Sequence, residues 1–350
     1  MQITTIGLDL AKNVFQIHGV DGDGCERVRR KLRRGDVLRF FEKLTPCLVG
    51  MEACAGAHHW ARQIATFGHE VKLIPPAYVK PYVRRQKNDM ADAAAICEAV
   101  GRPSMRFVPV KSETQQAALL AHRGRSLLIR QRTSLINAIR AHCAEFGLVA
   151  AKGPANITAL VAAILNERHP ALPHEARPAL LILLDQLKSL DVAIGAIEKE
   201  ATAGRRLDDR VRRLMTVPGI GVITATAIAA TVPDAGAFKS GREFAAWIGL
   251  VPRQQSSGGK ERLGGHTKMG DAYLRRLLIS GAHAVIAHSA RRKETAATWL
   301  GGLVARKPRM VAAVALANKT ARIAWAIMAR GETYRVIAWG GSGNPGGSKR

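Results

Sequence analysis

The sequence lacks several features that would assign it to common protein classes. Aromatic residues make up only 5% of the 350 residues, and the five cysteines include no CxxC pair. This cysteine pattern argues against a disulfide framework and a cysteine-based zinc site, and reduced thiols are typical of the cytoplasm. No apolar run approaches the ~20 residues of a transmembrane helix, and the N-terminus has no secretory signal. We therefore expect a cytoplasmic protein without a membrane-spanning segment.

Acidic residues are also scarce relative to basic ones. Lys and Arg number 53 and Asp and Glu number 27, so the formal net charge is +26, and most of the excess lies in residues 206–350. Such a field attracts polyanions, nucleic acid above all. The hydrophobic fraction of 47% is that of a folded chain, and the length indicates two or three domains. Because residues 1–110 hold the largest share of the carboxylates, we expect metal chemistry there and polyanion binding in residues 206–350.

Residues 1–110 show the order of elements that is typical of an α/β ribonuclease H-like (RuvC-like) domain. Three segments with strand patterns come first, at Ile3–Leu10, Val14–Val20 and Val28–Leu32. Helical and strand patterns then alternate, and the last strand pattern of this series ends at Pro75-Pro76. We expect this domain to bring the ends of its strands together at one site.

Residues 111–205 are almost wholly helical in pattern and predict a helical linker. Five apolar residues spaced four and three apart predict a seam along one helix: Leu183, Leu187, Leu190, Ile194 and Ile197. This spacing fits an antiparallel helical pair, an oligomeric coiled coil or an ordinary amphipathic helix. Residues 341–350 are rich in Gly and Ser, and we expect a disordered tail there.

Four acidic residues of the first domain are candidate magnesium ligands. Asp9 lies within an apolar strand pattern, where a carboxylate is costly to bury unless a cation neutralises it. Glu52 follows the apolar segment Cys47–Met51 and should emerge at the carboxyl end of that strand. Asp89 and Asp92 share one face at the start of a helix, a position where acids are also common without a metal. Mg²⁺ prefers oxygen ligands, and a two-metal site stabilises both the attacking and the leaving oxygen in phosphoryl transfer.

Residues 206–340 predict a mainly α-helical domain with basic loops. The segment 217–221, Val-Pro-Gly-Ile-Gly, joins two helical patterns as in a helix-hairpin-helix element. We expect the main chain at Gly219 and Gly221 to contact a phosphate, with a plain tight turn as the alternative. Composition alone favours a flexible turn for the Gly-rich segment that holds Ser256 and Ser257. The cations expected to contact nucleic acid, rather than only to form a solvated face, are Arg253, Lys260, Arg262, Lys268, Arg275 and Arg276.

Taken together, five short segments resemble the DEDD transposases of bacterial insertion sequences, known as the insertion-sequence one-ten family. This family includes pilin-inverting recombinases and bridge-RNA-guided recombinases, and the resemblance covers nearly the whole chain. The segments occur in the family's order and are specific as a set. They are Gly7–Lys12, Met51–Cys54, Lys87–Ala93, Val217–Gly221, and Gly249–Arg253 leading to Ser256-Ser257-Gly258.

The resemblance implies a particular chemistry. Asp9, Glu52, Asp89 and Asp92 would bind Mg²⁺ in the RuvC-like domain, and Ser257 of a C-terminal transposase domain would attack DNA to form a covalent phosphoserine. The neighbouring Ser256 leaves that assignment ambiguous by one position. The resemblance also implies a structured bridge RNA that pairs with donor and target DNA, and a homodimer or homotetramer with a contact along the Leu183–Ile197 seam. An RNA guide fits the lack of a recognition-helix or zinc-finger pattern.

Two other functions fit the same residues. A RuvC-like Holliday-junction resolvase or nuclease would use the acids to activate water and would form no protein–DNA bond. A nonenzymatic nucleic-acid-packaging protein would use the acids only structurally, so that Asp9→Asn would leave it unchanged. We favour a Mg²⁺-dependent DNA recombinase with a serine nucleophile and an RNA guide.

Overall fold

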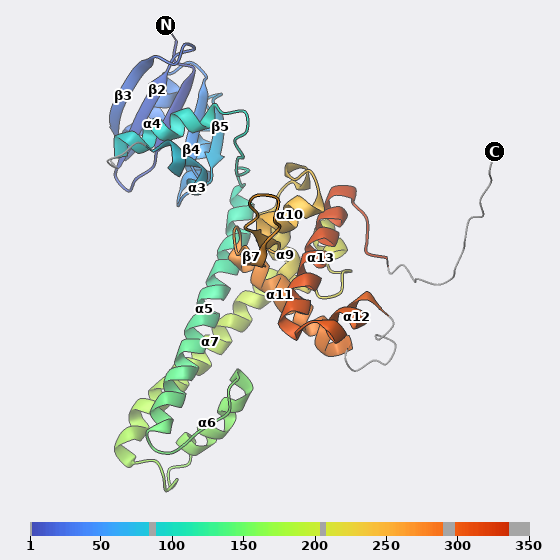
Figure 1. The fold of residues 1–350 in the computed structure, drawn as a ribbon. Coiled ribbons are helices and arrows are strands. Elements are labelled where there is room, and N and C mark those ends of the chain that lie inside the picture. The colour runs from blue at the N-terminus through green and yellow to red at the C-terminus, as the bar shows by residue number, and fades with distance from the viewer. Residues whose placement is uncertain (1, 84–88, 204–207, 290–297, 336–350) are drawn as a thin grey trace, which may run out of the picture. The chain divides into compact units, whose positions relative to one another are not determined.

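The structure is a computed structural model that describes residues 2–83, 89–203, 208–289 and 298–335. The chain divides into two compact units, Met1–Gln116 and Ala117–Arg350 (Figure 1). Most of the segment expected as a helical linker lies in the second unit. The expected disordered tail and the first two residues of the Lys87–Ala93 motif lie outside the described residues.

The first unit is a five-stranded mixed sheet with helices on both faces. The strands stand in the order β3-β2-β1-β4-β5; β2 runs antiparallel to β1 and β3, and β4 runs parallel to β1 and β5. The elements are β1 (Thr5–Asp9), β2 (Val14–Val20), β3 (Glu26–Arg33), α1 (Val37–Glu42), β4 (Leu48–Glu52), α2 (Ala57–Ala65), β5 (Glu70–Ile74), α3 (Pro76–Val79) and α4 (Asp89–Val100). This mixed sheet is consistent with the expected ribonuclease H-like domain, and each strand pattern read from the sequence corresponds to a strand.

The two faces of β1 explain where Asp9 points. Ile6 and Leu8 are fully buried in the core that includes residues of α1 and α2. Gly7 faces the other way and lies so close to α4 that a Cβ on it would overlap the carbonyl oxygen of Ala93. Because side chains alternate along a strand, Asp9 emerges on the same side as Gly7, toward α4.

In the second unit, α5 and α7 lie side by side and antiparallel (Figure 1). Arg125 and Arg132 of α5 pair with Glu198 and Asp191 of α7, at 2.6 and 2.9 Å. The helices here are α5 (Glu113–Ala144), α6 (Thr158–Leu165) and α7 (Arg177–Ala203). The antiparallel pair is therefore correct among the three alternatives for the leucine seam.

The same packing corrects the expected role of the seam. Leu187 is buried in one core cluster with Ile136 and Ile139 of α5, and Leu190 and Ile194 are buried as well. The seam is thus covered within the chain. Because residues of the same chain bury it, the seam is not a free surface for a contact between copies. The heptad-like spacing could not show this, since it does not specify which helix packs against the seam.

The rest of the second unit packs around α13. Its elements are α8 (Asp209–Leu214), α9 (Val222–Thr231), α10 (Gly241–Ile248), β6 (Pro252–Gln254), β7 (Leu263–His266), α11 (Ala272–Ser289), α12 (Trp299–Arg306) and α13 (Arg309–Arg330). Contrary to the expectation that no segment is long enough, α13 passes the length and composition test for a membrane span. One face of α13 is nevertheless buried at five alanines in the core of this unit, which identifies it as a core helix: Ala312, Ala313, Ala317, Ala321 and Ala324.

Candidate functional site

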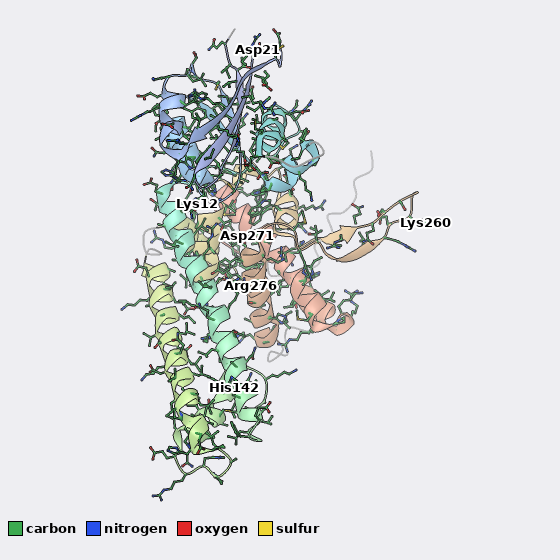
Figure 2. All side chains as sticks on the ribbon, turned by 90° about the vertical axis from the view of Figure 1, so that its left-hand side faces the viewer. Lys12, Asp21, His142, Lys260, Asp271 and Arg276 are labelled. Atoms are coloured by element: carbon green, nitrogen blue, oxygen red, sulfur yellow. The ribbon has the colours of Figure 1, made fainter. Side chains whose placement is uncertain are left out.

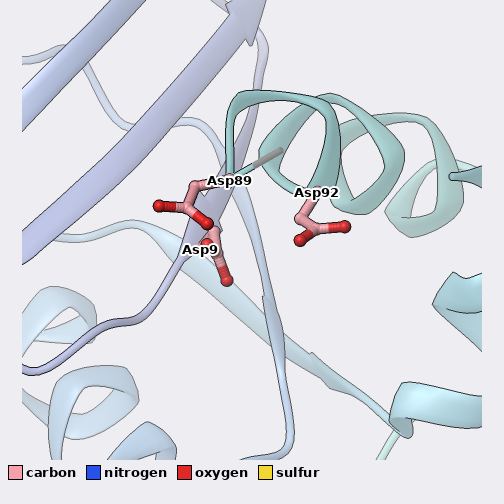
Figure 3. Close-up of side chains that lie close together, drawn as sticks. All are labelled: Asp9, Asp89 and Asp92. Atoms are coloured by element: carbon pink, nitrogen blue, oxygen red, sulfur yellow. The ribbon is translucent and has the colours of Figure 1, made fainter. Parts of the chain in front are cut away.

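Three of the four predicted acids lie together in the first unit. Asp9 ends β1, and Asp89 and Asp92 lie in the first turn of α4. One carboxylate oxygen from each lies within 4.8 Å of those of the other two. Figure 3 shows the three side chains gathered between the end of β1 and the start of α4. The close packing of Gly7 under Ala93, one turn further along α4, accounts for this convergence.

The electrostatics of Asp9 match a cation site. Burial, followed by the negative charges of Asp92, Glu52 and Asp89, raises the pKa of Asp9 to about 6. A cation between the carboxylates would offset this mutual repulsion and favour the ionised form. Three carboxylate oxygens at this spacing are hard donors of the kind that Mg²⁺ and Mn²⁺ prefer, so the residues present fit a divalent ion.

Glu52 stands beside this cluster rather than within it. It is the last residue of β4, one position beyond the Leu8–Met51 pair that aligns β1 with β4. It is half-buried, and its charge contributes to the raised pKa of Asp9. Its carboxylate is not among the oxygens within 4.8 Å of one another. The structure therefore brings three of the predicted ligands together and leaves Glu52 as their neighbour.

Cys54 lies near the acids but was not among the site residues predicted from the sequence. Cys54 is exposed, and burial of its thiol group together with the charges of Glu52 and Asp9 raises the pKa of Cys54. A thiol that is protonated at neutral pH is a poor metal ligand and a poor nucleophile. The chain turns here, since the main-chain N–H of Cys54 donates a hydrogen bond to the carbonyl oxygen of Glu52 at 2.8 Å, and the available signal was the closeness of Cys54 to Glu52 in the sequence.

The Gly-rich segment around the serines is a β-hairpin, not a loop. Strands β6 and β7 pair antiparallel, and Ser257 forms a bridge with Lys260 at the tip. Gly258 and Gly259 have φ of 57° and 76°, and two successive positive φ values are what a type I′ hairpin turn requires. Figure 2 shows Lys260 at the end of this projecting hairpin. The two glycines therefore set the turn that presents Ser257.

The two neighbouring serines differ in their hydrogen bonds. Ser256 Oγ accepts a hydrogen bond from the main-chain N–H of Arg262 at 3.3 Å, across the hairpin. Ser257 is exposed, and its hydroxyl makes no hydrogen bond with any residue that the structure describes. The free hydroxyl is thus that of Ser257.

Four of the predicted cations lie on the hairpin or next to it. Arg253, Lys260 and Arg262 are exposed on it, and none of them forms an ion pair with another described residue. Lys268, just beyond β7, is also exposed and has the positive φ of 58°. These four residues add positive charge on and beside the hairpin.

The two adjacent arginines of α11 have different surroundings. Arg275 is half-buried, and its Nη1 donates hydrogen bonds to the carbonyl oxygens of Ile248 and Met269, each at 2.7 Å. This differs from the expectation that both side chains face solvent or phosphate. Arg276 is exposed, with its guanidinium 5.8 Å from the centre of the Tyr273 ring.

The predicted phosphate-binding turn lies between α8 and α9, as expected for two helices joined by a short connection. Gly219 has φ of 88°, and a Cβ on it would lie 3.0 Å from the carbonyl oxygen of Gly281. Packing against α11 thus accounts for this glycine. Gly221 precedes α9, and a Cβ there would meet nothing within 4 Å. Its surroundings leave room for a ligand at the start of α9.

The fold and the site together define a mixed α/β unit with a carboxylate cluster, followed by a helical unit with a basic, serine-bearing hairpin. This combination is that of an enzyme acting on nucleic acid. A transposase family model of the DEDD type matches residues 6–146, and the model of the transposase IS116/IS110/IS902 family matches residues 211–297.

Individual relatives agree with both matches. The chain is 51% identical to a probable family 20 transposase of Pseudomonas aeruginosa, over 96% of this chain and 99% of the relative. It is 42% identical to the transposase for insertion sequence element IS1328 of Yersinia enterocolitica, over 95% and 98%. It is 40% identical to the transposase for IS1111A of Coxiella burnetii, over 96% and 92%. The chain belongs to the IS110 family of insertion-sequence transposases, which indicates a DNA-cleaving enzyme with DNA substrates.

Proposed function

We propose that this transposase cuts and rejoins DNA with the hydroxyl of Ser257 and a divalent metal, Mg²⁺, held by the carboxylates of the first unit. The observation that carries the proposal is the convergence of Asp9, Asp89 and Asp92 within 4.8 Å. Glu52 acts beside them as a fourth acid. When bound, the metal supplies positive charge to the phosphate and to the leaving oxygen.

The covalent step uses the free hydroxyl at the hairpin tip. Ser257 Oγ attacks the phosphorus and gives up its proton to solvent, while one bond between phosphorus and a strand oxygen breaks. The departing strand takes a proton and leaves with a free hydroxyl. A hydroxyl of the other DNA then attacks the phosphorus and gives up its proton to solvent, while the bond between phosphorus and Ser257 Oγ breaks. Oγ takes up a proton, so the serine is restored and the strands are rejoined. Arg253, Lys260 and Arg262 stabilise the negative charge on the phosphate during both attacks.

Trapping of the phosphoserine tests this step. Protein, Mg²⁺, the structured RNA encoded beside the gene and end-labelled DNA carrying the element's ends are incubated and then denatured, and labelled protein is measured. We expect an adduct with the wild-type chain and with Ser256→Ala, and none with Ser257→Ala. An adduct that survives Ser257→Ala removes Ser257 from the mechanism. Cut DNA without any adduct favours the alternative, a RuvC-like nuclease in which activated water attacks.

We further propose that a structured bridge RNA chooses the DNA sequences and that two or four copies assemble on them. The proposal rests on the resemblance described above and on the low aromatic content of 5%, which leaves few side chains for base readout. RNA that copurifies with the protein, and loss of strand exchange after ribonuclease treatment, would support it. Full activity with RNA-free protein would overturn the RNA guide and leave the metal and serine chemistry unaffected.

A further inference from the structure

A large groove in the second unit is formed without the acids and without the tip of the hairpin. Its volume is about 1430 Å³, and one face of α13 forms its floor. The start of α10, Trp299 of α12, and parts of β6 and β7 complete its walls. We call it the α13 groove. None of the predicted site residues lines the groove, although the strands β6 and β7, which carry Ser257 at their tip, form part of its wall.

The apolar part of the α13 groove is open to solvent. Trp299 is 48% exposed, Met310 59% and Val311 50%. Scattered apolar side chains on a surface are ordinary, but three that gather in one concave site indicate a binding surface. An occupant of this groove therefore presents flat or apolar groups.

The charges of the groove are of one sign. Arg242, Lys319 and Arg322 line it, all three are exposed, and no aspartate or glutamate is among its described lining residues. None of the three cations forms an ion pair with a described residue. The ammonium of Lys319 lies over the Trp299 ring, 4.4 Å from its centre, so a cation and an aromatic ring are in contact within the groove. The occupant is therefore both apolar and anionic.

Unpaired nucleic acid has both properties. Its bases offer flat faces that stack on aromatic side chains, and its phosphates pair with Lys and Arg; in a duplex the base faces are hidden by their neighbours. An apolar protein segment would leave Arg242, Lys319 and Arg322 without an anionic partner. A site of this size and composition thus favours a single strand with exposed bases.

The position of the hairpin favours DNA as that strand. Pro252 of β6 and Gly264, Gly265 and His266 of β7 form one wall of the groove. A Cβ on Gly265 would meet nothing within 4 Å, so this wall leaves space for a nucleotide backbone. Ser257 lies at the tip of the same two strands. A strand held in the groove therefore runs beside the hairpin that carries the attacking hydroxyl.

We propose that the α13 groove binds an unpaired segment of the DNA substrate next to the cleavage point, with a base stacked at Trp299 and phosphates on Arg242, Lys319 and Arg322. This assignment of DNA rests on the proposed role of Ser257. The groove holds the strand, and the cleavage chemistry lies elsewhere.

Binding of a short, fluorescein-labelled oligothymidylate to the full chain tests the proposal. The measurement is made in the presence of a chelator, so that cleavage plays no part. We expect Trp299→Ala to weaken binding by about fivefold to a hundredfold, and Trp299→Phe to restore most of it. Lys319→Gln and Arg322→Gln should each lower the slope of log affinity against log salt by about 0.7. The matched controls Val304→Ala on α12 and Arg330→Gln on α13, both outside the groove lining, should leave affinity and slope near wild type.

Photocrosslinking of a 5-iodouracil oligonucleotide to the wild-type chain gives a second measurement that does not depend on a variant. We expect the crosslinked peptide to contain Trp299 or the first turns of α13. Crosslinks confined to other regions, or unchanged affinity in Trp299→Ala, would overturn the proposal. Equal or tighter binding of oligouridylate would overturn the assignment to DNA, and a groove that binds only apolar peptides would overturn nucleic acid altogether.

The proposed function and the groove can fail separately. Asp9→Asn should bind the oligonucleotide like wild type while losing cleavage. Normal oligonucleotide binding by Trp299→Ala would rule out the groove as a DNA-binding site and would leave the proposed roles of the metal and Ser257 unaffected. Adduct formation that survives Ser257→Ala would remove the serine mechanism without changing the binding result.

Discussion

Gly7 of β1 lies directly against Ala93 of α4, with no room for a side chain between the strand and the helix. A Cβ on Gly7 would also lie 2.8 Å from the Cβ of Cys97, one turn further along α4. This contact holds the start of α4 close to the end of β1. The distance between Asp9 and the two acids of α4 therefore depends on a residue that carries no functional group.

Gly7→Ala should push α4 away from the sheet. Overpacking of a closely packed interior costs about 1–3 kcal/mol, and the variant should lose that much free energy of unfolding together with most of its affinity for Mn²⁺. Urea unfolding and calorimetric titration with Mn²⁺ measure the two effects. Gly35→Ala is the control, since a Cβ there would meet nothing within 4 Å. Wild-type stability and metal affinity in Gly7→Ala would contradict this account of the site.

The raised pKa of Asp9 predicts how stability depends on pH without metal. In the unfolded chain this carboxyl has its ordinary pKa of 3.8, and in the folded chain its pKa is about 6. The folded state binds the proton more tightly, so stability is lost as pH rises from about 4 through about 6. Asp9→Asn should remove this loss and raise stability at neutral pH by about 1 kcal/mol, a value reduced because the carboxyl is partly exposed.

Urea unfolding in a chelator across this pH range measures that effect. The exposed Asp23→Asn, in the same unit, should follow wild type. If Asp9→Asn is instead less stable than wild type at neutral pH, the carboxylate is engaged by a partner of the protein itself rather than repelled by its neighbours.

His122 predicts the opposite dependence in the second unit. It is buried, its Nδ1 lies 3.2 Å from the hydroxyl of Tyr273, and burial followed by the charge of Arg125 lowers its pKa to about 4. The neutral ring is favoured in the folded state, so stability is lost as pH falls from 6.5 to about 4. His122→Gln should reduce the loss of unfolding free energy over this pH range by on the order of 1–2 kcal/mol, whereas the exposed His142→Gln on the same helix should not. The same loss of stability below pH 6.5 in wild type, His122→Gln and His142→Gln would disprove the role of His122.

Arg275 and Arg276 should separate stability from DNA binding. Arg275→Lys loses the hydrogen bonds to two main-chain carbonyls and should cost about 1.5–3 kcal/mol of stability. Arg276→Gln should change stability by no more than about 0.5 kcal/mol and weaken DNA binding with a smaller salt slope. Thermal unfolding and anisotropy measurements on both variants test this division. Equal effects of the two substitutions on stability would contradict it.

The sheet and the acid of β1 were predictable because their patterns are local. Alternating or continuous apolar residues define β1, β2 and β4, and a carboxylate inside such a run stands out. The position of Glu52 outside the close cluster was not predictable, since it depends on how far each side chain reaches from its strand. That distance is set by tertiary packing.

The hairpin was missed and the choice of partner for α7 stayed open, for different reasons. The strands β6 and β7 are short and almost wholly exposed, so they carry no alternation of apolar and polar residues. Their only local signal was Gly258-Gly259 between two pairing segments, which is also the signal of a flexible turn. For Leu187 and Ile194, the seam spacing is the same whether the covering helix belongs to this chain or to another.

Metal binding by the acids tests the central claim most directly. Calorimetric titration of the DNA-free protein with Mn²⁺, followed by cleavage assays in Mg²⁺, should show binding and cleavage for wild type. In Asp9→Asn and in Asp92→Asn both should be lost, with DNA affinity retained; Asp23→Asn should keep all three. Undiminished cleavage by Asp9→Asn, or Mn²⁺ binding that is unaffected by either substitution, would contradict the proposal that these carboxylates hold the catalytic ion.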